Sequence, residues 1–327
     1  MPLSVADAHL ATGYEIQEGL NADIISTFSK FVNRSNDCWF NSVLQVIIHA
    51  IKNEENVPEP LDPEHNIYAA TLLNNIKQFC IPDTYDVGMI IKDPTVDDHP
   101  EIHLKHLMLK AMNIDTPGEL ENQQDASQCI QSLLEKIPHL NFLLHHIGDQ
   151  LDCDNCSYSR CIESPTPVTQ IEISKIRFID NTERFSAKDA ITGYFQNQEK
   201  VIRECDDCRT TTSSKKNTLT RADNYIIIQF KRYSLKRKRR GSSIKKITAK
   251  SDVFSCVNIN TSQGVTKYEV IATIEHTGDE LTSGHYMSYI LKNDTWYRCN
   301  DESVQPMSNS IDPIENVYIL LLKKVIE

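Results

Sequence analysis

The sequence has no long hydrophobic run of the kind that crosses a membrane. None of its apolar stretches approaches the ~18 to 20 residues that a membrane-spanning helix needs. The first twenty residues, MPLSVADAHLATGYEIQEGL, also lack the basic stretch and the apolar stretch of a secretory signal peptide. We therefore expect an intracellular protein, in the cytoplasm, the nucleus or both, without a membrane partner.

Positive charge is not in excess either. The 327 residues carry a formal net charge of −11, which disfavours nucleic-acid binding by the whole surface and suits an acidic surface that meets a basic partner. With 40% apolar and 24% charged residues, the chain can fill the core of a globular protein. The length allows one large domain or two ordinary ones, and the sequence shows no obvious internal repeat.

One segment departs from this charge balance. Residues 231–246, KRYSLKRKRRGSSIKK, contain nine Lys or Arg residues and no acidic residue. A solvated loop between strands is the favoured interpretation, because charge runs usually stay in solvent. A nuclear-localisation signal at residues 236–240 is the second interpretation, and a contact with nucleic acid is the weakest.

Disulfide bonds are not expected, although the chain has ten cysteines, because it is long and lacks a signal peptide. Four cysteines form two Cys-x-x-Cys pairs, Cys153 with Cys156 and Cys205 with Cys208. Two such pairs supply the four thiolates of a tetrahedral zinc site, so the sequence predicts structural zinc and no catalytic role for these residues. Coincidental pairs or redox dithiols are the alternative, and Cys161 is expected to be a nearby thiol.

The two halves of the chain differ in their patterning. Residues 38 to about 150 have mainly helical periodicity, whereas strand-like alternation and short apolar runs dominate from about residue 165. Residues 1–27 are weakly patterned. The separation of helices from strands favours an α+β fold over alternating β-α-β units.

Cys38 stands where a polar segment meets an apolar one, in NRSNDCWFNSVLQVIIHAI at residues 33–51. A helix is predicted from the i, i+3, i+4, i+7 spacing of its apolar residues, Phe40, Val43, Leu44 and Ile47. Asn36 and Asp37 are suitable N-cap residues, so Cys38 would lie at a helix N-terminus, where a thiolate nucleophile is favoured. The alternative is a small buried apolar cysteine.

A cysteine nucleophile needs a base, and His285 is the histidine with the most suitable neighbours. Gly284 precedes it, residues 286–291 alternate as a strand, and residues 296–299 are predicted to pair with that strand in a hairpin. The hairpin would bring Asn300 and Asp301 close to His285, where either side chain can orient the imidazole ring. The alternative is a structural histidine.

Taken together, these segments resemble the ubiquitin-specific proteases, a family of deubiquitinases. Residues 33–45, NRSNDCWFNSVLQ, are similar to the family's Cys box, N-x-G-N-T-C-Y-x-N-S-x-L-Q. The family's His box, H-x-G…G-H-Y-x-A-Y…W-Y-x-F-D/N-D, is matched by HTG, GHYMSY and WYRCND within residues 276–301. The segment QQDA at 123–126, the strand YIIIQFKRY at 225–233 and the two Cys-x-x-Cys pairs also follow the family pattern. The likeness covers roughly residues 30–325.

The resemblance implies an α+β, papain-like cysteine protease fold of the ubiquitin-specific protease type. After an N-terminal extension at 1–27, a helical thumb would occupy about 28–148, zinc-bearing β fingers about 149–224 and a β-rich palm about 225–327. The implied activity is hydrolysis of the isopeptide bond after the C-terminal glycine of ubiquitin. The implied partners are thus ubiquitin, or a ubiquitin-like protein, and its conjugates. A protease for another modifier, of the SUMO or ISG type, and a catalytically weak ubiquitin-binding scaffold stay open as alternatives.

By the same resemblance, Cys38 is the nucleophile of a Cys-His-Asn triad and His285 is the general base. Asn300 corresponds to the third member, and Asp301 follows it. Asn33 corresponds to the side-chain donor that stabilises the oxyanion.

The resemblance also implies contacts with the substrate. Asp125 corresponds to a residue that contacts the ubiquitin tail, and Gln124, His276 and Tyr286 lie in the same motifs. The ubiquitin tail carries arginines, which suits an acid-rich surface. Zinc, held by the four paired cysteines, is the implied structural cofactor.

The chain departs from the family pattern at several positions and is therefore identified as a divergent member. Ser35 replaces glycine, Asp37 replaces threonine, Trp39 replaces tyrosine and Cys299 replaces an aromatic residue. An aspartate directly before the nucleophile would oppose the formation of a thiolate.

Overall fold

The computed structural model describes residues 23–34, 36–54, 67–87, 90–92, 101–114, 122–175, 184–222, 224–238, 241–252, 254–280, 283–307 and 314–326. The expected N-terminal extension, residues 1–27, therefore lies mostly outside the described residues. Within the described ranges, no helix is both long enough and apolar enough to cross a membrane.

Helices dominate the N-terminal half, as the sequence predicts. The helices of this half are α2 (Cys38–Lys52), α3 (Ile67–Phe79), α4 (Leu104–Ala111), α5 (Ala126–Lys136) and the 3-10 helix η2 (Pro138–Leu143). The 3-10 helix η3 (Ile173–Lys175) and α6 (Ala187–Gln196) lie among the strands of the second half.

Helix α2 is the centre of the larger hydrophobic core. The predicted apolar stripe is buried, and so are residues on the other faces, including Trp39 and Ile48. The reason is that α2 lies between the other helices and the sheet, where it contacts α3, α5 and strands β16 and β17. The helix that carries Cys38 is thus fixed on several sides.

Most strands belong to one twelve-stranded sheet. Its main path runs through β19 (Ser303–Pro306), β18 (Thr295–Asn300), β17 (His285–Lys292), β16 (Gly264–Thr277), β15 (Cys256–Thr261), β10 (Thr212–Ala222), β5 (His145–Cys153) and β6 (Ser159–Thr166). Off this path, β20 (Val317–Lys324) pairs with both β16 and β11 (Tyr225–Lys231), β11 pairs with β7 (Thr169–Glu172), and β9 (Gln198–Ile202) pairs with β10. The α+β prediction is confirmed.

The predicted hairpin that follows His285 is also confirmed. Strands β17 and β18 pair from Ser288–Cys299 to Lys292–Thr295. The two turn residues, Asn293 and Asp294, have φ of 49° and 59°, as a tight two-residue hairpin turn requires. The start of β17 and the end of β18 therefore meet at one end of the hairpin.

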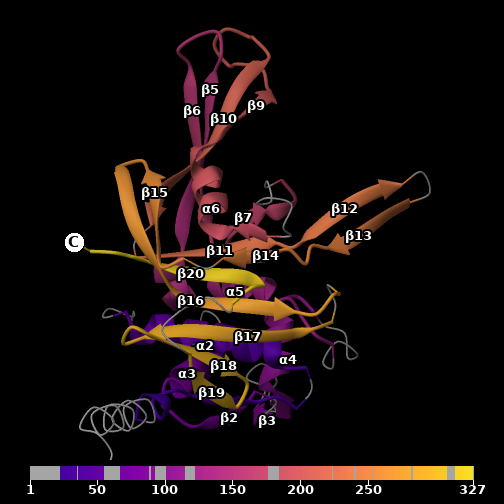
Figure 1. Cartoon of the computed structure of the whole chain (residues 1–327), viewed down its shortest axis with the longest axis vertical. Coiled ribbons are helices and arrows are strands. Elements are labelled where there is room, and N and C mark those ends of the chain that lie inside the picture. The colour runs from indigo at the N-terminus through magenta and orange to yellow at the C-terminus, as the bar shows by residue number, and fades with distance from the viewer. Residues whose placement is uncertain are drawn as a thin grey trace, which may run out of the picture.

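Strands β5, β6, β9 and β10 continue out of the body as an arm, at the top of Figure 1. The antiparallel register of β5 and β10 pairs Cys153 with Ser213, and that of β9 and β10 pairs Ile202 with Thr212. Both Cys-x-x-Cys pairs are therefore brought to the tip of the arm. The domain boundaries expected near residues 148 and 224 stay predictions.

The remaining strands form two-stranded pairs, β1 (Lys30–Val32) with β2 (Thr84–Asp86), β3 (Ile90–Lys92) with β4 (Glu101–His103), β8 (Arg184–Ser186) with β14 (Lys250–Asp252), and β12 (Tyr233–Lys238) with β13 (Gly241–Lys246). The β12–β13 pair projects sideways from the body in Figure 1. The basic segment is therefore a hairpin rather than the expected loop. Its last residue, Lys246, is buried rather than solvated.

Candidate active site

Cys38 is the first residue of α2 and is only 3% exposed. Before it, Asn36 takes a left-handed conformation with φ of 55°. The carbonyl of Asp37 accepts hydrogen bonds from the N–H groups of Phe40 and Asn41, both at 2.9 Å, and these bonds start the helix. The thiol thus lies at a helix N-terminus, where free N–H groups favour a thiolate.

Asp37 occupies the N-cap position, as the sequence predicts, but its side chain does not cap the helix. One carboxylate oxygen, Oδ2, accepts a hydrogen bond of 3.1 Å from the N–H of Arg34. The other, Oδ1, lies 2.6 Å from Nζ of Lys105, and both side chains of this ion pair are buried. The carboxylate next to Cys38 therefore has a buried cation as its partner.

His285 lies at the start of β17, opposite the end of β18. Its Nε2 donates a hydrogen bond of 2.6 Å to Oδ1 of Asn300, the last residue of β18. Because Nε2 is engaged there, the other ring nitrogen is available to the side chain of Cys38, which raises the pKa of the imidazole. Cys38, His285 and Asn300 therefore lie together at this end of the hairpin.

The pKa of His285 is raised to about 9. The largest cause is the hydrogen bond with Cys38, and the hydrogen bond with Asn300 and the negative charge at Cys38 and Asp301 act in the same direction. Partial burial opposes them. The arrangement therefore favours a protonated imidazole beside the sulfur.

Asp301 connects the sheet to the segment before α2. It lies in the turn after β18, with φ of 52°, and its carboxylate accepts hydrogen bonds from Nδ2 of Asn33 at 2.9 Å and Nδ2 of Asn41 at 2.8 Å. Its Oδ2 is 4.0 Å from Nε2 of His285. The Oδ1 of Asn33 in turn accepts a hydrogen bond of 2.9 Å from the N–H of Asp37. Asn33 is thus held at both ends of its amide.

Gln123 is a site residue that sequence reasoning missed. Its Nε2 lies 3.8 Å from Sγ of Cys38 and donates to it. The motif QQDA predicts its neighbour Gln124 instead, and two adjacent glutamines carry no local signal that distinguishes them. The pairing of Gln123 with Cys38 depends on how α5 packs against α2.

Asp125 is fixed by its neighbours. Its Oδ1 caps α5 by accepting from the N–H groups of Ser127 at 2.7 Å and Gln128 at 3.3 Å. Its Oδ2 accepts a hydrogen bond of 2.6 Å from the hydroxyl of Tyr318. The carboxylate is therefore held in one orientation at the start of α5, and its residue is half-buried.

His276 and Tyr286 lie in a buried cluster beside the site. Their rings stack with centroids 4.3 Å apart, and Tyr318 lies 6.0 Å from Tyr286. Burial, together with the positive charges of Lys246 and Arg232, lowers the pKa of His276 to about 3. His276 is therefore neutral at pH 7, and so low a pKa makes it a weak base.

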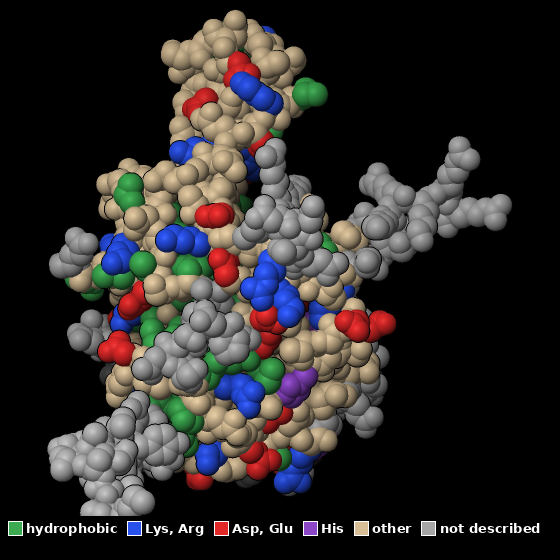
Figure 2. All heavy atoms as spheres, in the orientation of Figure 1, with side chains coloured by type: hydrophobic (Ala, Val, Ile, Leu, Met, Phe, Trp, Pro, Cys, Tyr) green, Lys and Arg blue, Asp and Glu red, His purple; other side chains and the backbone are tan. Residues whose placement is uncertain are grey.

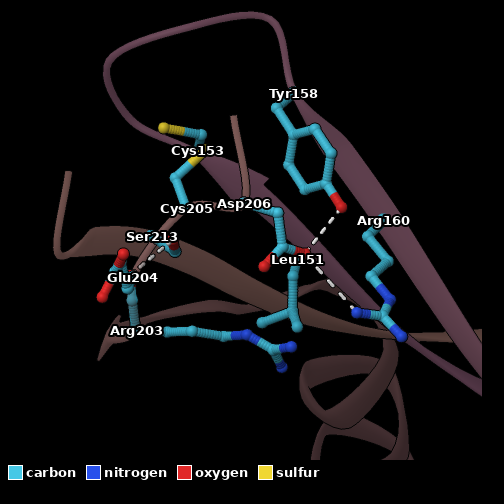
Figure 3. Close-up of a pocket in the computed structure, with 9 residues that line it drawn as sticks. All are labelled: Leu151, Cys153, Tyr158, Arg160, Arg203, Glu204, Cys205, Asp206 and Ser213. Carbon is cyan, nitrogen blue, oxygen red and sulfur yellow. Dashed lines mark hydrogen bonds and ion pairs between the residues drawn. The ribbon is translucent and has the colours of Figure 1, made fainter. Parts of the chain in front are cut away.

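At the tip of the arm, the sulfur atoms of Cys153, Cys156, Cys205 and Cys208 all lie within 4.8 Å of one another. Cys153 and Cys208 are 3.5 Å apart, and Cys156 and Cys205 are 3.7 Å apart. Four sulfurs in so small a space suit a tetrahedral metal ion. Figure 3 shows Cys153 and Cys205 together, with the hydrogen bonds from Tyr158 and Arg160 to Asp206 beside them.

The surroundings of the four cysteines fit bound thiolates. The backbone N–H of Asn155 donates to Sγ of Cys153 at 3.4 Å, and its side-chain amide donates to Sγ of Cys208 at 3.6 Å. Hydrogen bonds from Thr210, and then from Asn155, lower the pKa of Cys208. Against a backbone hydrogen bond from Tyr158, burial and the other three thiols raise the pKa of Cys156. N–H donors of this kind stabilise the charge of metal-bound sulfur.

The fold and the site define a class of protein, the cysteine hydrolases. In this class a thiol at the start of a helix lies beside a histidine and an asparagine of a sheet. A model of the family described as ubiquitin carboxyl-terminal hydrolase matches residues 29–322. The chain therefore belongs to the ubiquitin carboxyl-terminal hydrolase family.

Similar curated proteins share only parts of their length with this chain. Ubiquitin carboxyl-terminal hydrolase 2 of Bos taurus is 28% identical over 189 residues, which are 53% of this chain and 29% of that protein. Ubiquitin carboxyl-terminal hydrolase A of Dictyostelium discoideum is 41% identical over 63 residues, which are 19% of this chain and 7% of that protein. The matches thus span less than a third of these relatives.

Solved structures show the same fold. The SAGA DUB module bound to monoubiquitin aligns with a TM-score of 0.64 and 16% identity, over 92% of this chain and 70% of that chain. The SAGA Ubp8/Sgf11/Sus1/Sgf73 DUB module bound to ubiquitin aldehyde aligns with the same TM-score at 17% identity. The predicted papain-like fold of the ubiquitin-specific protease type is confirmed.

Proposed function

We propose that the protein is a thiol-dependent deubiquitinase that hydrolyses the isopeptide bond after the C-terminal glycine of ubiquitin. The observation that carries this proposal is the grouping of Cys38, His285 and Asn300, with the 2.6 Å bond between the histidine and the asparagine. Membership of the family supports the choice of substrate.

In the first step, His285 holds the proton of Cys38, so that the sulfur reacts as a thiolate. The raised pKa of His285, about 9, supports such an ion pair at neutral pH. The thiolate attacks the carbonyl carbon of the terminal glycine, and the C–S bond forms as the C=O bond opens to an oxyanion. Asn300 keeps the imidazole ring in the orientation that this step needs.

Donors next to Cys38 would stabilise the oxyanion. Asn33 donates one N–H to Asp301, and the second N–H of its amide is the one that would face the substrate. The amide of Gln123, 3.8 Å from the sulfur, is a further donor in reach of the developing charge. Each such donor typically lowers the barrier by about 3 to 4 kcal/mol.

His285 then gives its proton to the lysine nitrogen, the C–N bond breaks, and the amine leaves. This leaves ubiquitin joined to Cys38 as a thioester. A water molecule, deprotonated by His285, attacks the thioester carbon and releases the ubiquitin carboxylate and the free thiol. Asp301 contributes negative charge 4.0 Å from the imidazole whenever the ring is protonated.

Substrate contacts are proposed on the side of α5. The fixed carboxylate of Asp125 suits a contact with the ubiquitin tail, which carries arginines. His276 and Tyr286 are only 4% and 3% exposed, so they pack beneath the surface of this region and offer little area to a substrate. On the face shown in Figure 2, acidic and basic side chains are interspersed, so the negative net charge is not concentrated there.

Zinc is proposed as the ion that the four cysteines hold. Bound zinc would supply structural cross-linking at the tip of the arm, with Cys153, Cys156, Cys205 and Cys208 as its four ligands. We further expect an intracellular location, with residues 236–240 as a candidate nuclear signal.

The test is hydrolysis of fluorogenic C-terminal amides of ubiquitin and of SUMO. We expect turnover of the ubiquitin substrate, loss of turnover in Cys38→Ala, and wild-type turnover in Cys256→Ala, a half-buried thiol of β15. Turnover of the SUMO substrate alone would show that the substrate is another modifier and not ubiquitin. Turnover by Cys38→Ala would contradict the mechanism.

A further inference from the structure

A buried ion pair includes the residue that precedes the proposed nucleophile. Nζ of Lys105 is 2.6 Å from Oδ1 of Asp37, and the two side chains are 4% and 1% exposed. Asp37 precedes Cys38 in the chain, whereas Lys105 is the second residue of α4. Burying two charges carries a large desolvation cost, which their mutual attraction at this distance offsets.

The carboxylate of this pair is fastened to the turn before α2. Its Oδ2 accepts from the N–H of Arg34 at 3.1 Å, and the N–H of Asp37 donates to Oδ1 of Asn33 at 2.9 Å. Asn33 then donates to Asp301 at 2.9 Å. A displacement of Asp37 would therefore move the amide that is proposed to bind the oxyanion.

The backbone of Lys105 is itself fixed by a hydrogen bond. The N–H of Lys105 donates to the carbonyl of Val87 at 3.1 Å, just after β2. Strand β2 pairs in parallel with β1, and the side chain of Arg34 lies 2.6 Å from Asp86. The turn and the lysine are thus held against the same short segment.

We propose that Lys105 is a positioning residue for the reaction at Cys38, an inference that rests on the proposed function. Its ammonium group offsets the charge of Asp37, which alone would oppose a thiolate on the neighbouring residue. It also holds the turn that presents Asn33. With the charge of Asp37 offset in this way, position 37 affects the thiol of Cys38 much as a neutral residue would.

Lys105→Met tests the inference, because it removes the ammonium group that lies 2.6 Å from the buried carboxylate of Asp37. We expect kcat on the ubiquitin amide to fall by roughly 30-fold or more, with KM changed less than about threefold. We also expect iodoacetamide to alkylate Cys38 at least about fivefold more slowly at one fixed pH, since the thiolate is the reacting form. This second measurement needs no ubiquitin.

The double variant D37T/K105M removes both charges, and we expect it to recover kcat and the alkylation rate to within about fivefold of wild type. Lys110→Met, on the same helix, is the matched control and should leave both rates unchanged. Circular dichroism checks that each variant is folded. If Lys105→Met does not fold, the double variant decides, with recovery supporting the inference and loss of both rates overturning it.

Two results would overturn the inference while the proposed function stands. One is a folded Lys105→Met variant with both rates within about twofold of wild type. The other is a double variant as slow as Lys105→Met, which would give the lysine a role unrelated to the charge of Asp37. If wild type hydrolyses no ubiquitin substrate, the proposed function fails, and the alkylation rates still decide the inference about Lys105.

Discussion

His285 has a pKa raised to about 9, chiefly through its hydrogen bond with Cys38, and the bond with Asn300 raises it further. Because the shift is upward, the protonated imidazole is favoured below that pH and is lost as the pH rises through it. We expect kcat/KM to fall on the alkaline side near pH 9. In Asn300→Ala, which removes one cause of the shift, the alkaline limb should move to lower pH.

The measurement is a profile of kcat/KM from about pH 6 to about pH 10.5. Asn258→Ala, an exposed residue of β15, is the control and should keep the wild-type profile. An alkaline limb that stays in place in Asn300→Ala would show that Asn300 does not act on His285.

The single carboxylate of Asp301 accepts hydrogen bonds from both Asn33 and Asn41. Asp301→Ala removes one hydrogen bond from each amide. Displacing a catalytic donor by about 1 Å can cost about 100-fold in rate. We expect kcat to fall by roughly that factor while KM changes by only a few-fold. Glu302→Ala, at the exposed neighbouring residue, provides the comparison; a kcat of Asp301→Ala equal to that of Glu302→Ala would refute the bridging role.

At the scale of elements, the start of β17 depends on Gly284. A Cβ on this residue would lie 2.1 Å from the carbonyl oxygen of Thr277 and 2.7 Å from Nε2 of His276, and its φ of 150° is one that other residues rarely adopt. We expect Gly284→Ala to shift the first residues of β17, and with them His285, and to abolish measurable hydrolysis.

Gly264→Ala separates backbone strain from crowding. Gly264 also has a positive φ, 120°, but a Cβ there would meet nothing within 4 Å. It lies at the start of β16, and we expect this variant to be somewhat less stable and fully active. Hydrolysis by Gly284→Ala at the rate of Gly264→Ala would contradict the tight packing at the start of β17.

Local patterns were sufficient to predict the elements that carry the site. The spacing of Phe40, Val43, Leu44 and Ile47 identified α2, and the alternation after His285 identified the β17–β18 hairpin. Both depend on residues close in the chain. Two other contacts, of Lys105 with Asp37 and of Gln123 with Cys38, join segments that are distant in the chain. The periodicity of the sequence does not predict such contacts.

At the scale of the whole molecule, the arm and the body should respond separately to loss of metal. Cys205→Ser removes one of four proposed zinc ligands, and we expect loss of bound zinc and a fall in melting temperature of roughly 5 °C or more. The rate of Cys38 alkylation should stay at the wild-type value, because the site lies in the body.

Cys161→Ser is the matched control for this prediction, since Cys161 is an exposed thiol on the neighbouring strand β6. Metal content is measured by elemental analysis of the purified variants. Full zinc content in Cys205→Ser, or equal loss in Cys161→Ser, would contradict the four-cysteine site.

The overall arrangement was predicted through the family resemblance rather than through local patterns. Composition and segregation of helices and strands indicated only an α+β fold. The insertion of β20 between β11 and β16 in the middle of the sheet pairs Lys323 with both Tyr225 and Glu269, which are far from it in the sequence. Such long-range pairing leaves no signature in the sequence of β20, whose six consecutive buried residues indicate only that both of its faces are covered.

The most direct test of the central claim is a covalent one. The protein is incubated with ubiquitin that carries a C-terminal electrophile, and the adduct is mapped by mass spectrometry. The Cys38–His285–Asn300 arrangement predicts one stable adduct, on Cys38, that is absent in Cys38→Ala and forms more slowly in His285→Ala. An adduct on another cysteine, or no adduct with folded wild-type protein, would contradict the assignment of Cys38 as the nucleophile of a deubiquitinase.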